Sequence, residues 1–335
     1  MAIGTSYFGS RILRHVAADM EGLRSRGFTG VLHTFSENDF AYYREQMGRI
    51  VEASHAVGLE VQLGPWGFGR VFGGEAESSW VGRNIDRCQV MSDGRVVGAA
   101  CLNDPEFRAH LADWARAAVE AGADRVFWDE PHWAHPRHVG APEDTWGCRC
   151  ARCQQLFTDR FGAPMPTELT EEVRAFREDS LVDFVRELVR VVSGLGARSA
   201  VCLLPREDPL VGLRDWEPIA ATPGLDTLAT DPYWRAFGEP VEPFVGRFAA
   251  HTAALADRHE RLPQIWIQGF GLGPEDADEI HAAVTAARAA GVTDLWTWGF
   301  EACGHMPALG TRSPGQVWEA LCEALLDATP TAADR

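Results

Sequence analysis

Short apolar runs alternate with amphipathic stretches along the chain, and this alternation constrains the fold more than any other feature. Eight runs, rich in β-branched and aromatic residues, have the length and composition of buried strands. They span residues 3–8, 30–35, 60–65, 125–129, 200–204, 227–231, 264–270 and 294–300. The segments between them repeat apolar residues every three or four positions, as amphipathic helices do. Eight strand–helix units predict an α/β fold, a (β/α)8 TIM barrel of parallel strands.

Glycines directly after the helical segments support this organisation. Gly58, Gly122 and Gly291 each precede a predicted strand, where a glycine ends a helix well. The alternative fold is an open doubly wound sheet, but no Gly-x-Gly-x-x-Gly follows the first strand. We expect one barrel domain over residues 1–328 and a disordered tail over residues 329–335. Two connections, residues 66–103 and 131–170, are long enough to wall a pocket or carry function.

Composition narrows the possible partners. The net charge of −17 argues against nucleic acid or an anionic membrane surface and favours a neutral or cationic small substrate. The chain has no lysine, and all 31 basic residues are arginine. Schiff-base aldolase chemistry and pyridoxal phosphate are therefore excluded, and we expect no organic cofactor. The first residues show no export signal, no run is long enough to span a bilayer, and a cytoplasmic location is expected. The composition is compatible with a homo-oligomer as well as with a monomer.

Carboxylates recur where the predicted strands end, which is where barrel enzymes place their chemistry. Asp129 and Glu130 end the fourth strand, Asp231 ends the sixth, and Glu301 follows the eighth. Paired carboxyls are what cleavage of a glycosidic bond requires. Glu130 lies between tryptophans 128 and 133, and this apolar context favours the acid role for it, with Asp231 or Asp129 ionised. Weaker candidates are Glu37, Glu207 and Asp208.

Aromatic residues near the same strand ends predict a sugar-binding surface, because flat indole faces suit the C–H faces of sugar rings. The chain has 12 tryptophans and only 4 tyrosines. The predicted substrate-binding residues are Trp66, Trp133, Tyr233, Trp234 and Trp298, with Glu75, His132 and Gln268 as polar partners. Packing in the core is the alternative role for the tryptophans, and a solvated loop position is the alternative for His132.

Three cysteines lie within six residues, at positions 148, 150 and 153. Their spacing fits one tetrahedral zinc ion, and Cys101 is the best candidate for the fourth ligand, with Cys88 as a spare. Four thiolates leave no open position, so the predicted zinc is structural; a redox role is the alternative.

The residues around these motifs resemble a known family. Residues 101–107 (CLNDPEF), 126–130 (VFWDE) and 148–157 (CRCARCQQLF) are similar to the barrel domain of glycoside hydrolases, most of all family 42 β-galactosidases and related uncharacterised glycosidases. The resemblance is strongest over residues 99–190 and implies structural zinc on Cys101, Cys148, Cys150 and Cys153.

The chain departs from that family at the catalytic positions. The family's acid/base glutamate follows an asparagine, whereas Asp129 precedes Glu130 here, and Gln268 stands where the family has its nucleophilic glutamate. The second carboxyl would then be Asp231 or Glu301. Other barrel glycosidases use an aspartate on strand four as nucleophile and one on strand six as acid/base, and a resemblance to them implies the pair Asp129 and Asp231. We expect a glycoside hydrolase acting on a small glycoside or oligosaccharide. The alternatives are a metal-dependent sugar isomerase, epimerase or lyase, and a non-catalytic sugar-binding barrel.

Overall fold

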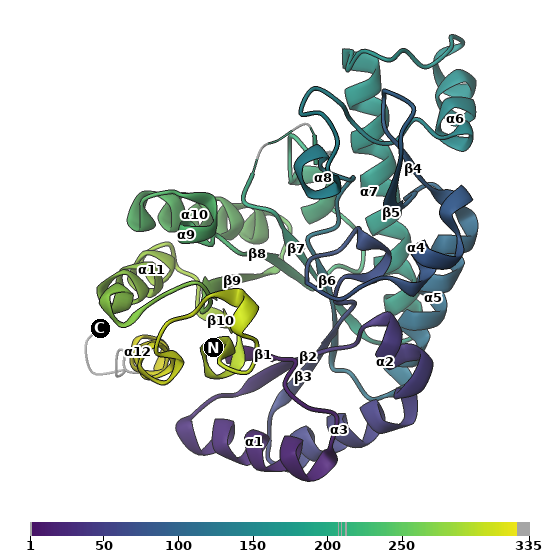
Figure 1. Ribbon diagram of the computed structural model, residues 1–335. Coiled ribbons are helices and arrows are strands. Elements are labelled where there is room, and N and C mark those ends of the chain that lie inside the picture. The colour runs from purple at the N-terminus through teal and green to yellow at the C-terminus, as the bar shows by residue number, and fades with distance from the viewer. Residues whose placement is uncertain (1, 207, 209, 212, 327–335) are drawn as a thin grey trace.

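The computed structural model describes residues 2–206, 208, 210, 211 and 213–326, and its eight parallel strands close into a barrel (Figure 1). The strands are β1 (Ile3–Tyr7), β2 (Gly30–Thr34), β3 (Glu60–Gly64), β6 (Arg125–Asp129), β7 (Arg198–Leu203), β8 (Thr227–Thr230), β9 (Leu262–Gln268) and β10 (Asp294–Trp298). They follow chain order around the barrel, and β1 pairs with β10 to close it. The predicted barrel and its eight strands are confirmed. The predicted tail, residues 329–335, lies outside the described residues.

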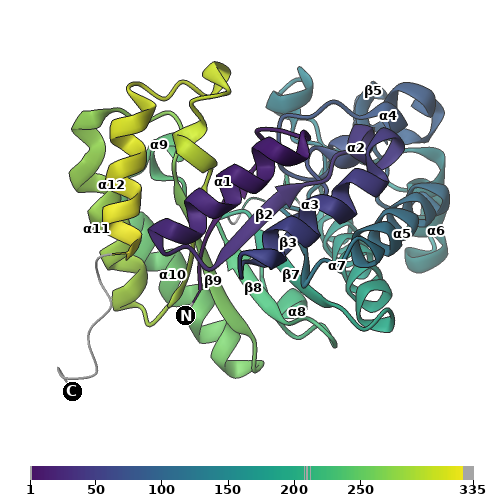
Figure 2. The same ribbon diagram turned by 90° about the horizontal axis from the view of Figure 1, so that it is seen from below.

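Helices surround the strands on the outside of the barrel (Figures 1 and 2). The α-helices are α1 (Leu13–Arg26), α2 (Glu37–Tyr42), α3 (Arg44–Ala56), α4 (Ser79–Arg83), α5 (Pro105–Glu120), α6 (Ala151–Phe161), α7 (Glu171–Gly194), α8 (Glu217–Ala220), α9 (Trp234–Phe237), α10 (Val241–Arg258), α11 (Ala277–Ala289) and α12 (Pro314–Leu326). Short 3-10 helices are η1 (Phe68–Arg70), η2 (Ile85–Arg87), η3 (Pro136–Val139), η4 (Pro274–Asp276), η5 (Phe300–Cys303) and η6 (Pro307–Leu309). Within the described part of the chain, no helix combines the length and apolar character needed to cross a membrane.

The two long connections form one lobe beside the barrel. The first contains an antiparallel hairpin of β4 (Cys88–Val90) and β5 (Val96–Ala100), which the sequence did not indicate. The second reaches the hairpin through a bridge between Met91 and Gly147 and a 2.7 Å hydrogen bond from Arg149 N to Val90 O. Figures 1 and 2 both place α4, β5 and α6 on the same side of the molecule.

Two apolar layers hold the barrel together. Residues that point outward from the strands, such as Trp128, pack with the helices, whereas Phe127, Trp266 and Trp296 belong to a separate cluster inside the barrel. This division follows from the alternation of side chains along a strand. Two of the strand glycines, Gly4 and Gly30, leave space for the Trp296 ring inside the barrel. A Cβ atom at Gly4 would lie 2.4 Å from the Trp296 ring.

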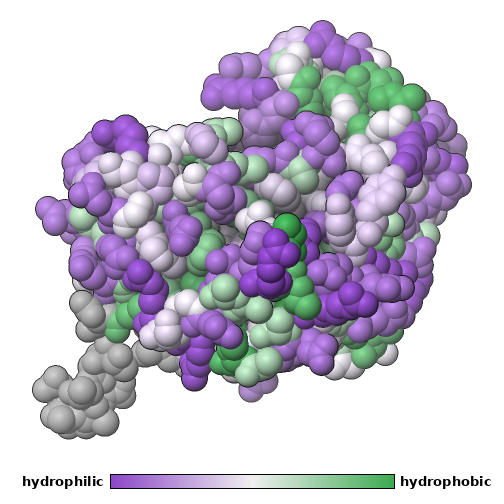
Figure 3. All heavy atoms as spheres, turned by 60° about the horizontal axis from the view of Figure 1, so that its bottom comes forward, coloured by the Kyte–Doolittle hydropathy of each residue, from purple (hydrophilic) through white to green (hydrophobic). Residues whose placement is uncertain are grey.

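The outer surface is mainly polar. On the face shown in Figure 3, hydrophilic residues predominate and hydrophobic residues form a few small groups. Among the described residues, the large apolar side chains that are exposed are Ile12, Tyr42, Tyr43, Ile85, Val96, Leu195 and Leu262. Most other large apolar side chains in the described part of the chain are buried or half-buried in the two layers.

Candidate functional site

A cleft of about 580 Å³ lies at the carboxyl ends of the strands, and we call it the mouth cleft. It is lined by Gly74, Glu75, Asp129, Glu130, His135, Arg137, His138, Leu204, Pro205, Arg206, Val211, Asp231, Tyr233, Ala236, Phe237, Glu239, Phe244, Arg247, Phe270 and Trp298. A side arm of about 360 Å³ shares Glu130 and five other lining residues with it. The predicted carboxylates of β6 and β8 thus meet in one cavity.

Three carboxyls converge on the floor of the mouth cleft. Asp129 is the last residue of β6, and Glu130 follows it with a left-handed φ of 44°. The Glu130 backbone is held by a 3.0 Å hydrogen bond from its N–H to Cys202 O on β7. Asp231 follows β8, is only 3 % exposed, and its carboxyl is in hydrogen-bonding contact with that of Glu130. A left-handed backbone costs energy for any residue other than glycine. The strain at Glu130 therefore indicates that the direction of its side chain is important at this site.

Burial makes these carboxyls hold protons more tightly than usual. Burial first, and then the charges of Glu130 and Glu75, raise the pKa of Asp129 well above its ordinary value. Burial also raises the pKa of Glu130, but its contact with Asp231 acts in the opposite direction. For Asp231, burial and the Glu130 carboxyl both raise the pKa, well above its ordinary value. Burial thus raises the pKa of both partners of the pair, and the assignment of Glu130 as the acid stays a prediction from its sequence context.

Gly73 packs directly against this group of carboxyls. A Cβ atom at Gly73 would lie 2.6 Å from Asp129 Oδ2 and 2.9 Å from Glu130 Oε2. The Gly73 N–H also donates a 3.0 Å hydrogen bond to Asp129 O. The loop after β3 thus fixes the position of both carboxyls, and only the absence of a side chain permits this close approach.

Aromatic rings form one wall of the site. The Phe8 ring stacks between Trp66 and Trp298, with ring centroids 5.4 Å and 5.5 Å apart. Trp66 Nε1 donates a 3.0 Å hydrogen bond to Glu75 Oε2. Trp298 and Glu75 line the mouth cleft, as does Tyr233, which meets the Phe270 ring edge-on. Phe8 ends the first predicted strand, and its position at a strand end is the signal that could have identified it.

His132 lines the side arm rather than the mouth cleft. Its Nδ1 lies 2.5 Å from Glu130 O, so the ring donates its N–H to that carbonyl and Nε2 is left as an acceptor. Burial lowers the pKa of His132 to about 4, and the ring is therefore neutral at neutral pH. The side arm also contains Arg70, His135 and His138, none of which was identified from the sequence.

Besides Trp66, four predicted site residues lie outside the lining of both cavities. Trp133 and Trp234 are buried, and their indole N–H groups donate to Arg177 O at 3.0 Å and to Glu279 Oε2 at 2.7 Å. Gln268 is 1 % exposed, accepts from Arg235 N and donates to Phe270 O, so its amide supports the start of α9. Glu301 lies on η5 and is exposed. These residues stabilise the surroundings of the cleft and do not line it.

Glu37, one of the weaker catalytic candidates, organises the loop after β3. Its buried carboxylate accepts hydrogen bonds from Gly69 N, Ser78 Oγ, Ser79 Oγ and Trp80 N at 2.6–2.9 Å. Those four donors satisfy the buried charge. Glu37 therefore holds the segment that carries Arg70 and Gly73.

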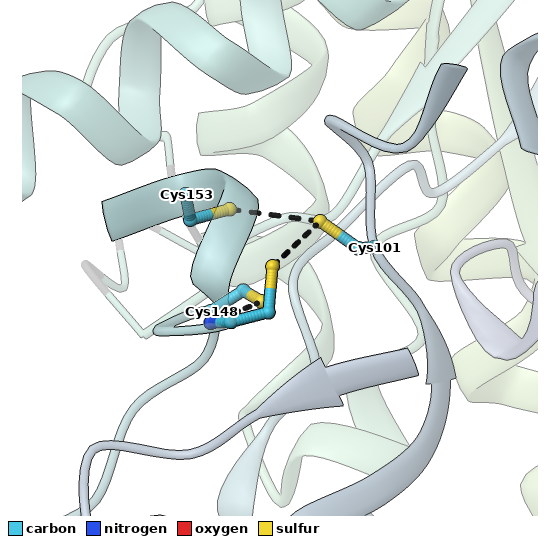
Figure 4. A group of neighbouring side chains, drawn as sticks. Cys101, Cys148 and Cys153 are labelled. Atoms are coloured by element: carbon cyan, nitrogen blue, oxygen red, sulfur yellow. Dashed lines mark hydrogen bonds between the residues drawn. The ribbon is translucent and has the colours of Figure 1, made fainter. Parts of the chain in front are cut away.

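Four cysteines converge between the two long loops. Cys101, Cys148, Cys150 and Cys153 place their Sγ atoms within 4.8 Å of one another, and none forms a disulfide. Figure 4 shows Cys101 on the loop after β5, with its sulfur facing Cys153 on α6 and the residues before that helix. The Sγ atoms of Cys101 and Cys153 are 3.5 Å apart, and those of Cys101 and Cys150 are 3.7 Å apart. Sulfur atoms around one zinc ion, each at about 2.3 Å, stand about 3.8 Å apart. The donor set therefore fits a tetrahedral metal ion.

Polar groups surround this cysteine cluster. Asn103 Nδ2 donates to Cys153 Sγ at 3.4 Å, and Cys150 N donates to Cys148 Sγ at 3.4 Å. Donors of this kind orient and stabilise thiolate ligands. The predicted spare, Cys88, is buried outside the cluster.

No protein-family model matches the chain, and no curated protein matches its sequence. Its fold is similar to that of solved structures. One is the catalytic domain of β-amylase from Paenibacillus polymyxa, with a TM-score of 0.66, 9 % identity, and coverage of 98 % of this chain and 99 % of that one. Another is the endo-1,4-β-mannanase from Rhizomucor miehei, with a TM-score of 0.64, 11 % identity, and coverage of 97 % and 93 %.

The endo-β-1,4-mannanase from Thermotoga petrophila is also similar, with a TM-score of 0.59, 10 % identity, and coverage of 98 % of this chain and 77 % of that one. At these identities the likeness establishes the fold alone. The chain shares the (β/α)8 barrel of these glycoside hydrolases over nearly its whole length.

Proposed function

We propose that this protein is a glycoside hydrolase whose chemistry is carried by Glu130 and Asp231, with Asp129 beside them. The observation that supports this most strongly is the contact between the Glu130 and Asp231 carboxyls in a cleft at the carboxyl ends of the strands. Buried carboxyls that share a proton provide both the acid and the base that glycoside cleavage needs. The likeness in fold to glycoside hydrolases agrees with this assignment.

The reaction is a hydrolysis in which one carboxyl loses a proton and another provides a negative charge. The protonated carboxyl of the pair gives its proton to the glycosidic oxygen as the bond to the anomeric carbon breaks. An ionised carboxylate then attacks the anomeric carbon or removes a proton from the attacking water. The water supplies the hydroxyl of the released sugar and restores the proton. Tyr233, Trp298 and Glu75 bind the sugar in this proposal, with His132 at the side arm.

A bound glycoside has to separate the two carboxyls. Retaining glycosidases hold their pair about 5–5.5 Å apart and inverting ones about 6.5–9.5 Å apart, so a pair in direct contact cannot flank a bond. Entry of the sugar breaks the contact, and the carboxyl that loses its partner becomes free to act on the substrate.

A panel of nitrophenyl glycosides and small oligosaccharides tests the function. Wild-type protein should release product from at least one member, and Asp231→Asn protein prepared in parallel should release far less. Binding of sugars with no turnover of any member would contradict the proposal. That result would favour a non-catalytic sugar-binding barrel, which the buried and fully bonded Gln268 also supports, because it supplies no carboxyl from β9.

We also propose that the four cysteines hold a structural zinc ion. All four ligands are sulfur, and their convergence at distances near 3.8 Å supports a closed tetrahedral site. The ion would link the loop after β5 to the start of α6 and would take no part in the chemistry of the cleft. Among the described residues, the cysteine cluster is the one group of three or more His, Cys, Asp or Glu side chains placed to hold a metal ion.

A further inference from the structure

The side arm of the mouth cleft differs from the cleft in its charge. Its lining contains a single carboxylate, Glu130, where it meets the mouth cleft. The other ionisable residues of its wall are Arg70, His132, His135 and His138, and we call these four the basic arm. A cavity of about 360 Å³ that opens directly onto the reacting carboxyls and is lined in this way is suited to part of the substrate.

Arg70 carries the fixed charge of the basic arm. The structure gives it no carboxylate partner within the described residues, and its guanidinium donates only a long hydrogen bond, 3.4 Å, to Ala76 O. Its backbone is left-handed, with φ of 54°, as is that of Glu130. The segment around it is anchored by the bond from Gly69 N to the Glu37 carboxylate at 2.9 Å. The loop thus holds a guanidinium at the cavity wall at a cost in backbone strain.

The histidines supply neutral hydrogen-bonding groups around this charge. Burial lowers the pKa of His138, and the nearby guanidinium groups of Arg206 and Arg70 lower it further. His135 accepts a hydrogen bond from Arg137 N on Nδ1, and its Nε2 faces Asp208 at 3.6 Å. Asp208 also lies 3.6 Å from Arg206, so this carboxylate offsets the charge of Arg206, and no carboxylate among the described residues pairs with Arg70.

We propose that the basic arm binds an oxyanion of the substrate, so that the protein acts on an acidic carbohydrate, either a uronic acid or a sulfated sugar. Arg70 pairs with the oxyanion, since a guanidinium matches the geometry of such groups. His138 donates to the same group, and the Nε2 acceptor of His132 takes a neighbouring sugar hydroxyl. This inference rests on the proposed function, because it assigns the substrate class of the same cleft.

The net charge of −17 does not oppose this assignment. Charges on the outer surface are screened over about 8 Å at physiological ionic strength, whereas Arg70 lies at the cavity wall. The carboxyls nearby repel an anion less than their number suggests, because burial and their mutual contacts raise the pKa of Asp129 and Asp231 and keep protons on them.

Matched pairs of ligands test the inference. Binding is measured by calorimetry, and hydrolysis by product release, for methyl and nitrophenyl glycosides of glucuronic, galacturonic and mannuronic acid, for their neutral hexose counterparts, and for the 6-sulfated hexosides. The proteins are wild type, Arg70→Gln, and Arg116→Gln as a control that removes an equivalent charge from the outside of α5.

We expect an acidic member to bind at least tenfold more tightly than its neutral counterpart. Arg70→Gln should abolish this preference and Arg116→Gln should not. The uronides and sulfated sugars identify which oxyanion is bound.

The outcomes separate this inference from the proposed function. Hydrolysis of a neutral glycoside that requires Glu130 but not Arg70 would overturn the inference and leave the proposed function standing. Binding of an acidic sugar that depends on Arg70, without hydrolysis of any member, would support the inference and overturn the proposed function. Failure of every acidic member to bind, or a preference that survives in Arg70→Gln protein, overturns the inference.

Discussion

The carboxyls of Glu130 and Asp231 are in hydrogen-bonding contact across the barrel mouth, although β7 separates the strands that carry them. The left-handed backbone of Glu130 and the burial of Asp231 bring the two groups together. Two carboxyls that face each other in a buried site cannot both ionise easily, so one retains a proton. The acid and the base of the proposed reaction are thus present in the free protein as one pair.

This pair should make stability fall as pH rises. The raised pKa of Asp231 means that the folded protein keeps a proton that the unfolded chain releases. The stability that this proton provides is fully present below the unfolded-state pKa and is lost as pH rises through the folded-state pKa. Each unit of difference between the two is worth about 1.4 kcal/mol. Asp231→Asn protein should therefore gain free energy of unfolding relative to wild type as the pH rises above about 4, the ordinary pKa of an aspartate.

Urea unfolding at several pH values measures this difference, with Asp257→Asn on the exposed end of α10 as the control. A gap between wild type and Asp231→Asn that stays constant with pH would show that Asp231 titrates alike in the folded and unfolded states.

The second prediction concerns Gly73. In Gly73→Ala protein the new methyl group would meet Asp129 Oδ2 at 2.6 Å, so the carboxyls or the loop must move. Turnover of any substrate should fall at least about tenfold, because displacements of this size disturb catalytic geometry. The free energy of unfolding should fall by about 1–3 kcal/mol, as overpacking does elsewhere. Gly82→Ala, at a position in α4 with no atom near the added Cβ, is the matched control; it should leave turnover unchanged and should not lower the free energy of unfolding. Equal turnover in the two variants would contradict the packing described here.

The third prediction concerns the cysteine cluster. Protein purified without added metal should contain one zinc ion per chain by elemental analysis, and Cys150→Ser should lose it. Loss of the ion should lower the free energy of unfolding by about 3 kcal/mol or more, since a metal site links two long loops. Cys322→Ser, a buried cysteine on α12, should retain the zinc. Wild-type protein without a bound metal, or full zinc in Cys150→Ser, would show that the cluster is not a zinc site.

The sequence predicted the barrel and the convergence of strand-end carboxylates, because strand alternation and parallel topology fix where strand ends lie. It did not predict which tryptophans face the cleft. Trp133 follows β6 closely but packs on Arg177, whereas Phe8, Trp66 and Trp298 stack at the mouth. The direction of a side chain beyond a strand end depends on loop conformation, which periodicity does not encode.

The basic arm was missed for the same reason. Arg70 and His138 come from two different loops and meet only because Glu37 anchors one loop and the β4–β5 hairpin supports the other. The hairpin itself was not apparent in the sequence, since β4 has only three residues and β5 (VVGAA) has no polar side chains that alternate with apolar ones. The spacing of three cysteines, in contrast, is local, and it identified the residues that the structure brings together.

The measurement that tests the central proposal most directly is the turnover of Glu130→Gln and Asp231→Asn protein on the glycoside that wild type hydrolyses best. Each variant removes one ionisable carboxyl while keeping its shape, so both should lose at least about a hundredfold in kcat, the lower end for acid/base catalysis. Asp208→Asn, whose carboxyl pairs with Arg206 outside the group on the cleft floor, should keep its rate within a fewfold of wild type. Near-normal kcat in both Glu130→Gln and Asp231→Asn protein would contradict the account, because neither carboxyl of the proposed pair would then be needed for turnover.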